Sequence, residues 1–419
     1  MTARVGPDPI AEAAARTAAG ESARIVSTLI RITGDFALAE DCLQDALAKA
    51  LTEWRTTGVP TNPGAWLTTV AKNRAIDLLR RASAESRAVQ RLAHEPAGPR
   101  APDGPDGGEV TVDADDRLTL IFTCCHPALS MDARVALTLR TVAGLTAAEI
   151  ARLFLVTEST MEKRLVRTRA RIRNTGIPYR VPSPEHLPAR RDGVLAVLYL
   201  LFTAGYGATA GPSLIRLPLL EEAIGLARML VELMPDDPEA RGLLALMLLQ
   251  HSRSAARIDS TGDLVTLEHQ DRGLWDAARA AEGLALLTRR VSQPGRYELQ
   301  ARIAACHAQA LDADHTDFGQ IVTLYDALGA VAPSPLVELN RAVAVAMHEG
   351  PAVGLALLDR LEEGGALAGY HFLAATRADL LRRLGRGREA AREYERARGL
   401  APTDAERRYL ERRLSEVTA

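Results

Sequence analysis

The side chains best suited to binding chemistry lie along one stretch of the sequence, residues 62–81. An indole ring, amide and carboxylate groups and a guanidinium recur there three or four residues apart, which places them on one face of a helix. Such a set suits unpaired bases beside a phosphate backbone, because one aromatic–base stack is worth roughly 1–3 kcal/mol. The face consists of Trp66, Thr69, Asn73, Asp77 and Arg80, with Arg81 nearby for phosphate. The alternative is an amphipathic helix with a half-buried Trp and solvated Arg side chains.

The element that must hold these side chains is a helix that begins at Pro63. Proline suits the first turn of a helix, where its missing N–H is no loss. Asn62 can cap that turn by accepting a backbone N–H. Another face of the helix is an apolar stripe that requires a partner helix. The stripe consists of Leu67, Val70, Ala71, Ala75, Leu78 and Leu79.

A second polar set lies on the preceding predicted helix, residues 37–54. Its members are Glu40, Asp41, Gln44 and Asp45. They form either a docking face for a basic surface of a partner or an ordinary solvated face. The buried side of the same helix is predicted to contain Leu43, Ala46, Leu47, Ala50, Leu51 and Trp54. A helix over residues 21–33 comes before it and ends at Gly34-Asp35, and a possible helix start at Asp8-Pro9 lies further upstream.

Two short helices across a tight turn are predicted further along the chain. Thr146 and Glu149 have the spacing of a capping box, which begins a helix over residues 147–154. Thr157 can cap a second helix that runs to about Arg173. The second helix has an inward face, predicted to be Met161, Leu165, Thr168 and Ile172, and a basic side with Lys163, Arg164, Arg167, Arg169, Arg171 and Arg173. This pattern is typical of a helix-turn-helix with a DNA-recognition helix; the alternative is a solvated basic helix.

The composition narrows the classes of function. The 419 residues carry a formal net charge of −2, so any DNA contact has to be local or assisted by a partner. Hydrophobic residues at 47% and aromatic residues at 4%, with abundant Ala, Leu and Arg, favour bundles of helices. The sequence has no Walker loop, dinucleotide fingerprint or nucleophile motif, so we expect neither an enzyme nor a cofactor.

The four cysteines, in a chain of this length, indicate a reducing compartment. Cys124 and Cys125 precede His126, but adjacent cysteines point to different helix faces and no second Cys/His pair stands at zinc spacing. We therefore expect small core residues and no metal. No segment has eighteen uncharged apolar residues in a row, and the N-terminus lacks a signal-peptide pattern. These features predict a cytoplasmic protein without membrane contact.

Three segments resemble the promoter-melting domain of sigma-70 family sigma factors. They are residues 39–45 (AEDCLQD), 63–67 (PGAWL) and 73–81 (NRAIDLLRR), in that order. Residues 160–169 (TMEKRLVRTR) resemble the helix with which the same family reads the −35 promoter element. The resemblance is to the extracytoplasmic-function (ECF) group, which keeps only two of the family's domains.

The resemblance implies a role for each set of side chains. One set would bind the clamp helices of the β′ subunit of core RNA polymerase. Its members would be Glu40, Asp41, Gln44 and Asp45. A second set would capture flipped bases of the −10 element, assisted by the loop from Trp54 to Asn62. Its members would be Trp66, Asn73, Asp77, Arg80 and Arg81. The set that reads the −35 element, in a domain that also contacts the β flap, would be Ser159, Thr160, Lys163, Arg164 and Arg167. Glu162 stands where many relatives carry a basic or small residue, which bears on the promoter sequence and not on the role.

Composition also separates the domains. Residues 83–116 mix Pro and Gly with acidic side chains and predict a flexible tether; in the resembled family this linker threads the polymerase channel, where its acidity would mimic a nucleic-acid backbone. Prolines between Asn174 and Arg190 mark a second linker. Helix follows helix from Arg191 onward, and Tyr370 to Pro402 matches a tetratricopeptide repeat (TPR). Two segments interrupt the repeats, a Gly-rich loop that begins at residues 200–207 and a polar insertion over residues 251–275; each is an ordinary loop or a ligand site.

The predicted protein is all-α, with two small promoter-binding domains and a helical-repeat extension like that of one sigma-factor subgroup. Its expected parts are an N-terminal segment 1–20, a sigma region 2 domain 21–82, a linker 83–116, a region 4 helix-turn-helix domain 117–176, a linker 177–190 and a TPR-like regulatory domain 191–419. It is expected to bind core RNA polymerase and promoter DNA and to help melt the duplex. The extension is expected to contact the sigma domains within the chain and modulate them. The alternatives are a stand-alone helix-turn-helix regulator with a ligand-sensing solenoid, or a scaffold protein, neither of which needs the two sets within residues 37–81.

Overall fold

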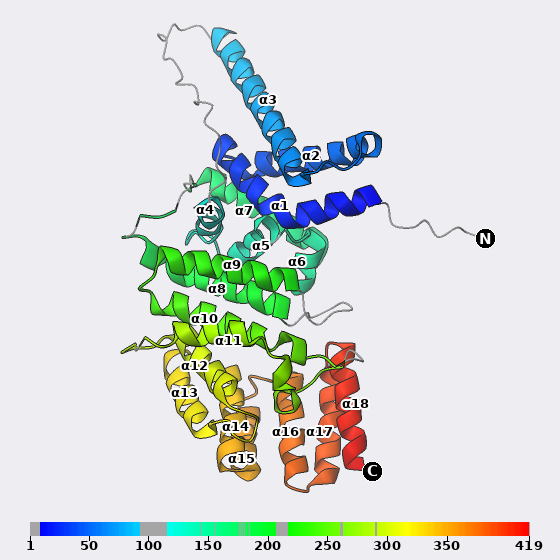
Figure 1. Cartoon of the computed structure of the whole chain (residues 1–419), viewed down its shortest axis with the longest axis vertical. Helices are drawn as coiled ribbons and strands as arrows, with labels where there is room; N and C mark the ends of the chain where they lie inside the picture. Colours follow the sequence, from blue (N-terminus) through cyan, green and yellow to red (C-terminus); the bar gives the residue numbers. More distant parts are fainter. Residues whose placement is uncertain are drawn as a thin grey trace, which may run out of the picture. The chain divides into compact units, whose positions relative to one another are not determined.

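The computed structural model is helical through nearly all of the residues that it describes (Figure 1). These are residues 9–92, 115–142, 144–154, 156–175, 177, 179, 181–183, 185–206, 217–259, 263–289 and 291–418. Among them the one extended pairing is an isolated antiparallel bridge between Ile258 and Leu264. The predicted all-α class is confirmed. The Pro/Gly-rich part of the expected first linker, residues 93–114, lies outside the described residues.

The chain divides into two compact units, Met1–Val197 and Leu198–Ala419. The division falls inside helix α8 (Leu187–Tyr206), and the domain start that the sequence analysis expected, residue 191, lies in the same helix, seven residues before Leu198. The N-terminal half of α8 belongs to the first unit, where Arg190 donates from Nη1 to the carbonyl of Phe122 at 3.4 Å. One helix therefore runs through the boundary between the units.

Three helices make up the first part of unit 1: α1 (Pro9–Thr33), α2 (Phe36–Thr57) and α3 (Pro63–Leu92). Each packs against the other two. Their shared core contains Ile25, Leu29, Ile30, Ala39, Leu43, Ala46, Ala50, Trp54, Leu67, Ala71 and Ala75. The expected burial of Leu51 is wrong, since its side chain is 39% exposed. The neighbouring helices cover the stripe through Ala46, Ala50 and Trp54, and Leu51 lies beside that stripe.

The helix boundaries follow local chemistry. Gly34 adopts a left-handed φ of 68°, and its N–H donates to the carbonyl of Ile30 at 2.7 Å, which ends α1. Asp35 then caps α2, because its Oδ1 accepts from the N–H of Ala37 at 2.7 Å. The predicted end of the first helix at Gly34-Asp35 is confirmed. α3 runs past the expected domain end at residue 82 to Leu92, since the first proline beyond Pro63 is Pro96.

The second part of unit 1 contains α4 (Asp115–Cys124), α5 (Met131–Thr141), α6 (Ala147–Leu153) and α7 (Glu158–Asn174). The predicted capping box is present: Glu149 donates its N–H to Thr146 Oγ1 at 3.2 Å, and Thr146 N–H donates to Glu149 Oε2 at 2.8 Å. Thr157 Oγ1 accepts from the N–H of Thr160 at 3.3 Å at the start of α7. These caps fix a helix-turn-helix in which α6 and α7 pack together.

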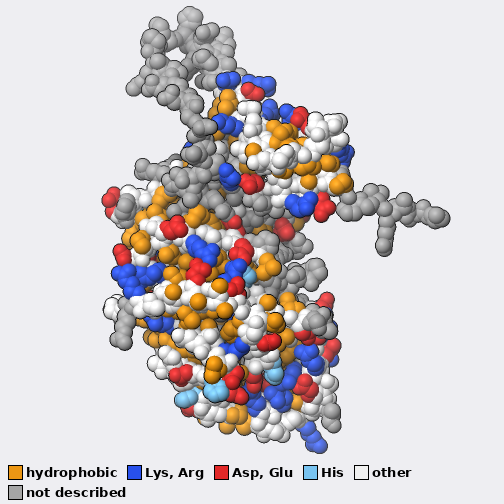
Figure 2. Space-filling model, in the orientation of Figure 1, with side chains coloured by type: hydrophobic (Ala, Val, Ile, Leu, Met, Phe, Trp, Pro, Cys, Tyr) orange, Lys and Arg blue, Asp and Glu red, His pale blue; other side chains and the backbone are white. Residues whose placement is uncertain are grey.

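Unit 2 continues as pairs of neighbouring helices, which Figure 1 shows as successive hairpins. Its helices are α9 (Leu217–Leu233), α10 (Pro238–Ser252), α11 (Ala277–Leu286), α12 (Arg296–Gln309), α13 (Phe318–Val331), α14 (Pro335–Glu349), α15 (Pro351–Glu363), α16 (His371–Arg383), α17 (Gly387–Leu400) and α18 (Asp404–Thr418). Positively and negatively charged side chains are interspersed on the face that Figure 2 shows. Many are paired across a turn or between helices, as Arg386 is with Glu389 at 2.7 Å.

The predicted TPR-like unit corresponds to α16 and α17. The small residues expected between the paired helices are buried, namely Ala378, Ala390 and Ala397, and Tyr394 fills the groove at 2% exposure. Gly385 turns the chain between the two helices with a φ of 73°. The helical-repeat architecture of this region is confirmed.

The two expected interruptions of the repeats have different outcomes. Residues 200–206 are not a loop, because α8 stays helical through Tyr206. Gly205 allows α9 to approach closely, since a Cβ atom there would lie 3.1 Å from Leu220. In the polar insertion, the described residues 253–259 and 263–275 are irregular apart from three short 3₁₀ turns: η1 (Ser254–Ala256), η2 (Leu267–His269) and η3 (Arg272–Leu274).

Candidate functional site

The polar face of α3 is presented to solvent by the packing of its other side. Asn62 Oδ1 accepts from the N–H of Ala65 at 3.0 Å and fixes the first turn. Leu67, Ala71 and Ala75 are fully buried against α1 and α2. The residues left exposed on the outer face are Thr69, Asn73, Asp77, Arg80 and Arg81. α3 therefore offers amide, carboxylate and guanidinium groups at helical spacing, as the sequence analysis expected.

Trp66 lies at the edge of that face and is half-buried. Its ring meets the buried ring of Trp54 edge to face, with the centroids 5.5 Å apart. The contact ties the start of α3 to the end of α2. Only part of the indole is therefore exposed on this face.

Three of the four candidate polymerase-binding side chains on α2 are exposed to solvent. Asp41, Gln44 and Asp45 are exposed. Asp45 Oδ2 accepts from Arg74 Nε of α3 at 2.7 Å, and both side chains remain about half exposed, at 52% and 40%. Two carboxylates and an amide at adjacent helical positions form an acidic-polar face suited to a basic partner.

Glu40 departs from its expected place on that exposed face. Its side chain is 14% exposed and forms an ion pair with Arg169 of α7. Arg140 of α5 lies 3.9 Å away on the other carboxylate oxygen. Burial raises the pKa of the Glu40 carboxyl, and the two guanidinium groups act against that increase. Glu40 thus holds the first helical group of unit 1 (α1–α3) against the second (α4–α7).

Other contacts reinforce this interface within unit 1. Arg173 Nη1 of α7 lies 3.4 Å from Asp35 Oδ2. The Tyr179 hydroxyl donates to the carbonyl of Ser27 at 3.3 Å, and its ring packs edge to face on Phe36 with centroids 6.4 Å apart. The sequence analysis missed these contacts, since nothing in a local pattern links residues more than a hundred positions apart.

The basic helix α7 has a buried side that matches the prediction. Its buried residues are Met161, Leu165, Thr168 and Ile172. On the outer side, Ser159, Thr160, Lys163 and Arg167 are exposed. The N-terminal half of the helix therefore projects hydroxyl and cationic groups into solvent, as a recognition helix requires.

Arg164 does not share the exposure of its neighbours. Its side chain is 26% exposed, and Nη1 lies 3.5 Å from Asp132 Oδ2 of α5. The guanidinium carbon also stands 5.4 Å from the centroid of the Phe154 ring. Arg164 thus joins α5, α7 and the turn that follows α6, and the structure gives it a packing role that the sequence analysis did not anticipate.

The cysteines are buried in the core. Cys124 Sγ lies 3.4 Å from Thr141 Oγ1, and burial raises the pKa of both Cys124 and Cys125, that of Cys125 to about 12. Such thiols stay protonated at neutral pH. Within the described residues no group of three or more His, Cys, Asp or Glu side chains is arranged to hold a metal ion.

Comparisons with known families match both helical groups of unit 1. Residues 21–85 match Sigma-70 region 2, and residues 119–172 match Sigma-70, region 4. The first match spans the exposed faces of α2 and α3, and the second ends within α7. The chain belongs to the sigma-70 family. This sigma factor has a DNA-binding role in transcription initiation, and it is of the ECF-like type with a C-terminal extension.

The C-terminal extension of this sigma factor has its own family match. Residues 190–291 match a family of unknown function, DUF6596. An uncharacterized protein of Rhizobium meliloti (strain 1021) is 41% identical over 396 residues, which cover 94% of this chain and 93% of that protein. A thermophilic TPR protein of Thermus thermophilus covers 48% of this chain and 92% of its own, with 21% identity and a TM-score of 0.33. Among the described residues, no helix is long and apolar enough to cross a membrane.

Proposed function

We propose that this sigma factor docks on core RNA polymerase through α2, captures the −10 element through α3 and reads the −35 element through α7. The observation that carries the proposal is that the polar faces of these three helices are exposed in the unit that contains both sigma-70 matches. The chain would initiate transcription at promoters with both elements and help to open the duplex. Binding, not covalent chemistry, accounts for each step.

The docking step rests on the acidic face of α2. Asp41, Gln44 and Asp45 are exposed and would meet the clamp of the β′ subunit, while the helix-turn-helix domain would meet the β flap. Glu40 becomes available only when Arg169 releases it. Polymerase docking is therefore coupled to separation of α2 from α7.

The opening step rests on α3. Flipping a base costs a few kcal/mol, which new contacts must return. Asn73 and Asp77 supply hydrogen bonds from the exposed face, and Arg80 and Arg81 stand one turn further on for the backbone. The exposed part of Trp66 adds a stacking surface.

The reading step rests on Lys163 and Arg167 of α7, with Ser159 and Thr160 at the N-terminal turn. A side chain paired to two acceptors on a base edge discriminates by about 1–3 kcal/mol, whereas a phosphate contact strengthens binding to every sequence alike. Arg164 would support this surface from beneath, since it is held by Asp132 and Phe154.

The extension would act on the promoter-binding domains from within the chain. A covalent connection keeps the effective concentration of one unit near the other at roughly the millimolar level, so even a weak contact is occupied much of the time. We place this regulation, like transcription itself, in the cytoplasm, and expect core RNA polymerase and promoter DNA as the intermolecular partners.

A charge reversal on α2 tests the docking step. Asp41→Lys and Asp45→Lys together should lower the affinity for core polymerase at least tenfold, because two ammonium groups would then face a basic surface and repel it. The measurement is capture of purified core polymerase by the immobilised full-length chain. The matched control is Glu12→Lys, an exposed reversal on α1 outside the region 2 match. Equal capture by the double variant and the control would contradict the proposed docking face.

A further inference from the structure

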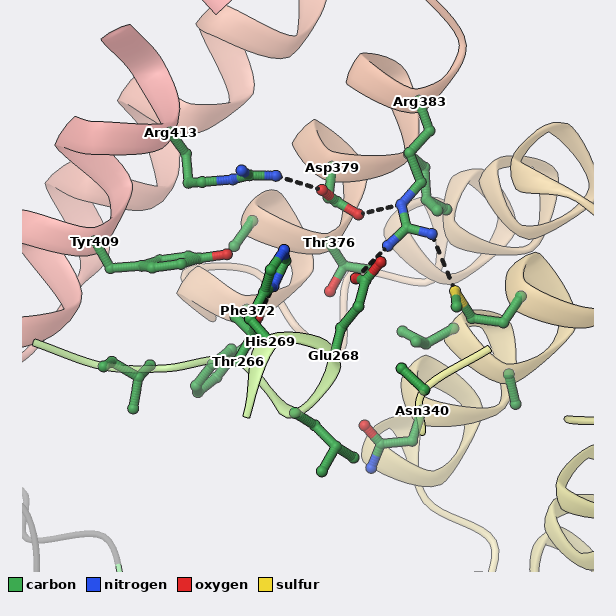
Figure 3. A pocket seen from close by; sticks show the side chains of 18 of the residues that line it. Thr266, Glu268, His269, Asn340, Phe372, Thr376, Asp379, Arg383, Tyr409 and Arg413 are labelled. Atoms are coloured by element: carbon green, nitrogen blue, oxygen red, sulfur yellow. Dashed lines mark hydrogen bonds and ion pairs between the residues drawn. The ribbon is translucent and has the colours of Figure 1, made fainter. Parts of the chain in front are cut away.

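A cavity in unit 2 lies where the polar insertion meets the repeat helices (Figure 3). Its volume is about 390 Å³, within the range of sites for small organic molecules. Helices α12–α14 and α16–α18 form its walls, and residues 264–269 of the insertion form a further wall. No part of the promoter-binding surface contributes to it.

One wall of the cavity is apolar and open. Val343 of α14 and Phe372 of α16 are 36% and 43% exposed, and Met347 and Tyr409 also line the space. Large apolar side chains exposed in a concavity mark a surface that gains stability when it is covered. The cavity can therefore hold the apolar body of a ligand.

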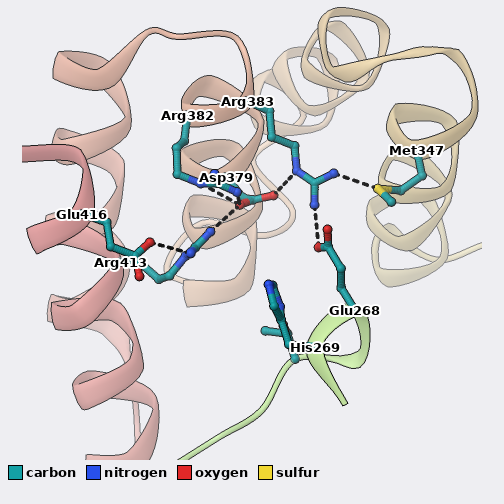
Figure 4. Close-up of polar contacts among 9 residues, drawn as sticks. Glu268, His269, Met347, Asp379, Arg382, Arg383, Arg413 and Glu416 are labelled. Carbon is teal, nitrogen blue, oxygen red and sulfur yellow. Dashed lines mark hydrogen bonds and ion pairs between the residues drawn. The ribbon is translucent and has the colours of Figure 1, made fainter. Parts of the chain in front are cut away.

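The carboxylates of the cavity are already neutralised. Asp379 accepts from Arg382 and Arg383 at 2.7 Å each and lies 3.3 Å from Arg413 (Figure 4). Glu406 accepts from the Thr403 hydroxyl at 2.8 Å. Because these anions are satisfied within the protein, the cavity offers little to a cationic ligand.

Arg383 differs because one of its nitrogens has a poor partner. Nε and Nη2 donate to Asp379 and Glu268, at 2.7 and 2.8 Å. Nη1 donates to the sulfur of Met347, at 3.1 Å. A thioether is a weak acceptor, so a carboxylate oxygen in that position would form a much stronger, charge-assisted hydrogen bond.

Glu268 already places one carboxylate on this guanidinium. It belongs to η2 of the insertion, and its side chain is 46% exposed. The same segment is held at Asp263, which pairs with Arg408 at 2.6 Å and Arg412 at 3.5 Å. Half-exposed ion pairs of this kind contribute little stability, so an anion that enters the cavity can compete with Glu268.

We propose that this cavity binds a small organic acid, with its carboxylate on Arg383 and its apolar body against Val343 and Phe372. The ligand carries one carboxylate, which matches the one nitrogen of Arg383 that has only a sulfur partner. On binding it takes the place of Glu268 or the Met347 sulfur at Arg383. Residues 264–269 of the insertion, which the sequence analysis left open as a loop or a ligand site, then form one wall of that site.

Matched acids and alcohols test the proposal on the full-length chain. The acids are hexanoate, octanoate and 4-phenylbutyrate, and the alcohols are hexanol, octanol and 4-phenylbutanol, each titrated by calorimetry. At least one acid should bind with one-to-one stoichiometry and about tenfold more tightly than its alcohol, the effect of one charge-assisted hydrogen bond. No saturable binding by any of the acids, or equal binding of acid and alcohol, would overturn the proposal.

Variants assign the binding to the cavity. Arg383→Gln should remove the preference for acid over alcohol, whereas Arg386→Gln, at an exposed arginine three residues away, should keep it. Glu268→Gln should tighten the acid severalfold and leave the alcohol unchanged. Val343→Trp, at an exposed position on α14, should abolish both while thermal unfolding shows an intact fold.

An acid preference that survives Arg383→Gln, or binding that survives Val343→Trp, would place the ligand elsewhere and refute the site. Binding of a synthetic peptide with the sequence of residues 264–269, but of none of the acids, would assign the groove to peptides instead. The experiment uses neither polymerase nor DNA, so its result is separate from that of the proposed function.

Discussion

At the scale of single residues, α7 separates arginines that serve the fold from those available to DNA. Arg164 is packed on Phe154 and paired with Asp132, whereas Arg167 is exposed. Both carry the same charge and stand three residues apart. Their environments, and not their residue type, decide which of them is open to solvent and free for the proposed promoter contact.

Alanine substitutions should separate the two roles. Arg167→Ala should reduce promoter-specific binding by about 1–3 kcal/mol and leave the free energy of unfolding within about 0.5 kcal/mol of wild type. Arg164→Ala should destabilise the first unit by about 1 kcal/mol, through the lost cation–π contact and ion pair. The measurements are DNA-binding titration and urea unfolding. A stable Arg164→Ala variant that loses only promoter binding would reverse the assignment.

A partly buried histidine in unit 2 predicts a loss of stability in acid. Burial, with Arg253 and Arg272 nearby, lowers the pKa of His307 from 6.5 to about 4. Below pH 6.5 the unfolded chain binds a proton that the folded chain refuses, so stability falls as the pH falls towards 4. This group should cost about 2 kcal/mol between pH 7 and pH 5.

Urea unfolding at both pH values measures that cost, and His307→Gln should remove it. The control is His315→Gln, because Asp312 raises the pKa of this exposed histidine and its effect has the opposite sign. A His307→Gln variant with the same acid loss as wild type would contradict the prediction.

At the scale of elements, the sequence predicts what is set by neighbouring residues. The caps at Asn62, Thr146 and Thr157 and the buried stripe of α7 follow from spacings of three and four residues, which fix positions on a helix whatever it packs against. The burial of Leu51 was mispredicted because it depends on how wide a face the partner helices cover: Trp54, further along α2, is buried, whereas Leu51 lies beside the covered stripe. An apolar stripe in the sequence shows which face of a helix is buried, but it does not show how wide a face the covering helices bury.

The interface between α2 and α7 could not be read from the sequence. Glu40 and Arg169 lie far apart in the chain, and a charged pattern on each helix is compatible with solvent, DNA or a partner protein. The pairing became visible only when the tertiary fold brought them together.

Release of this interface should control docking. Arg169→Gln leaves Glu40 partly buried without its main partner, which destabilises the contact between the two helical groups. The variant should therefore associate with core polymerase severalfold faster than wild type, as followed by surface-immobilised binding kinetics. Arg171→Gln, an exposed change on the same helix, should leave the rate unchanged. Identical rates for the two variants would show that the contact does not limit docking.

At the scale of the whole molecule, a promoter-binding unit is followed by a helical-repeat unit with a cavity of its own. The sequence analysis expected these parts in this order, because proline-rich segments and changes in composition mark where cores end. It could not locate the cavity, since Glu268 and Arg383 meet across 115 positions. It placed the start of the last domain at residue 191, seven residues before Leu198 in the same helix, because a continuous helix carries no local signal of where one core ends.

The central claim, that α3 captures an opened strand for polymerase, is tested most directly by run-off transcription with purified core polymerase. The templates are a duplex promoter and the same promoter with a pre-melted −10 bubble. Wild type should produce a specific transcript from both. Asn73→Ala, at an exposed position of α3, should lose at least tenfold on the duplex and much less on the bubble. Equal losses on the two templates, or no specific transcript with wild type, would contradict the account.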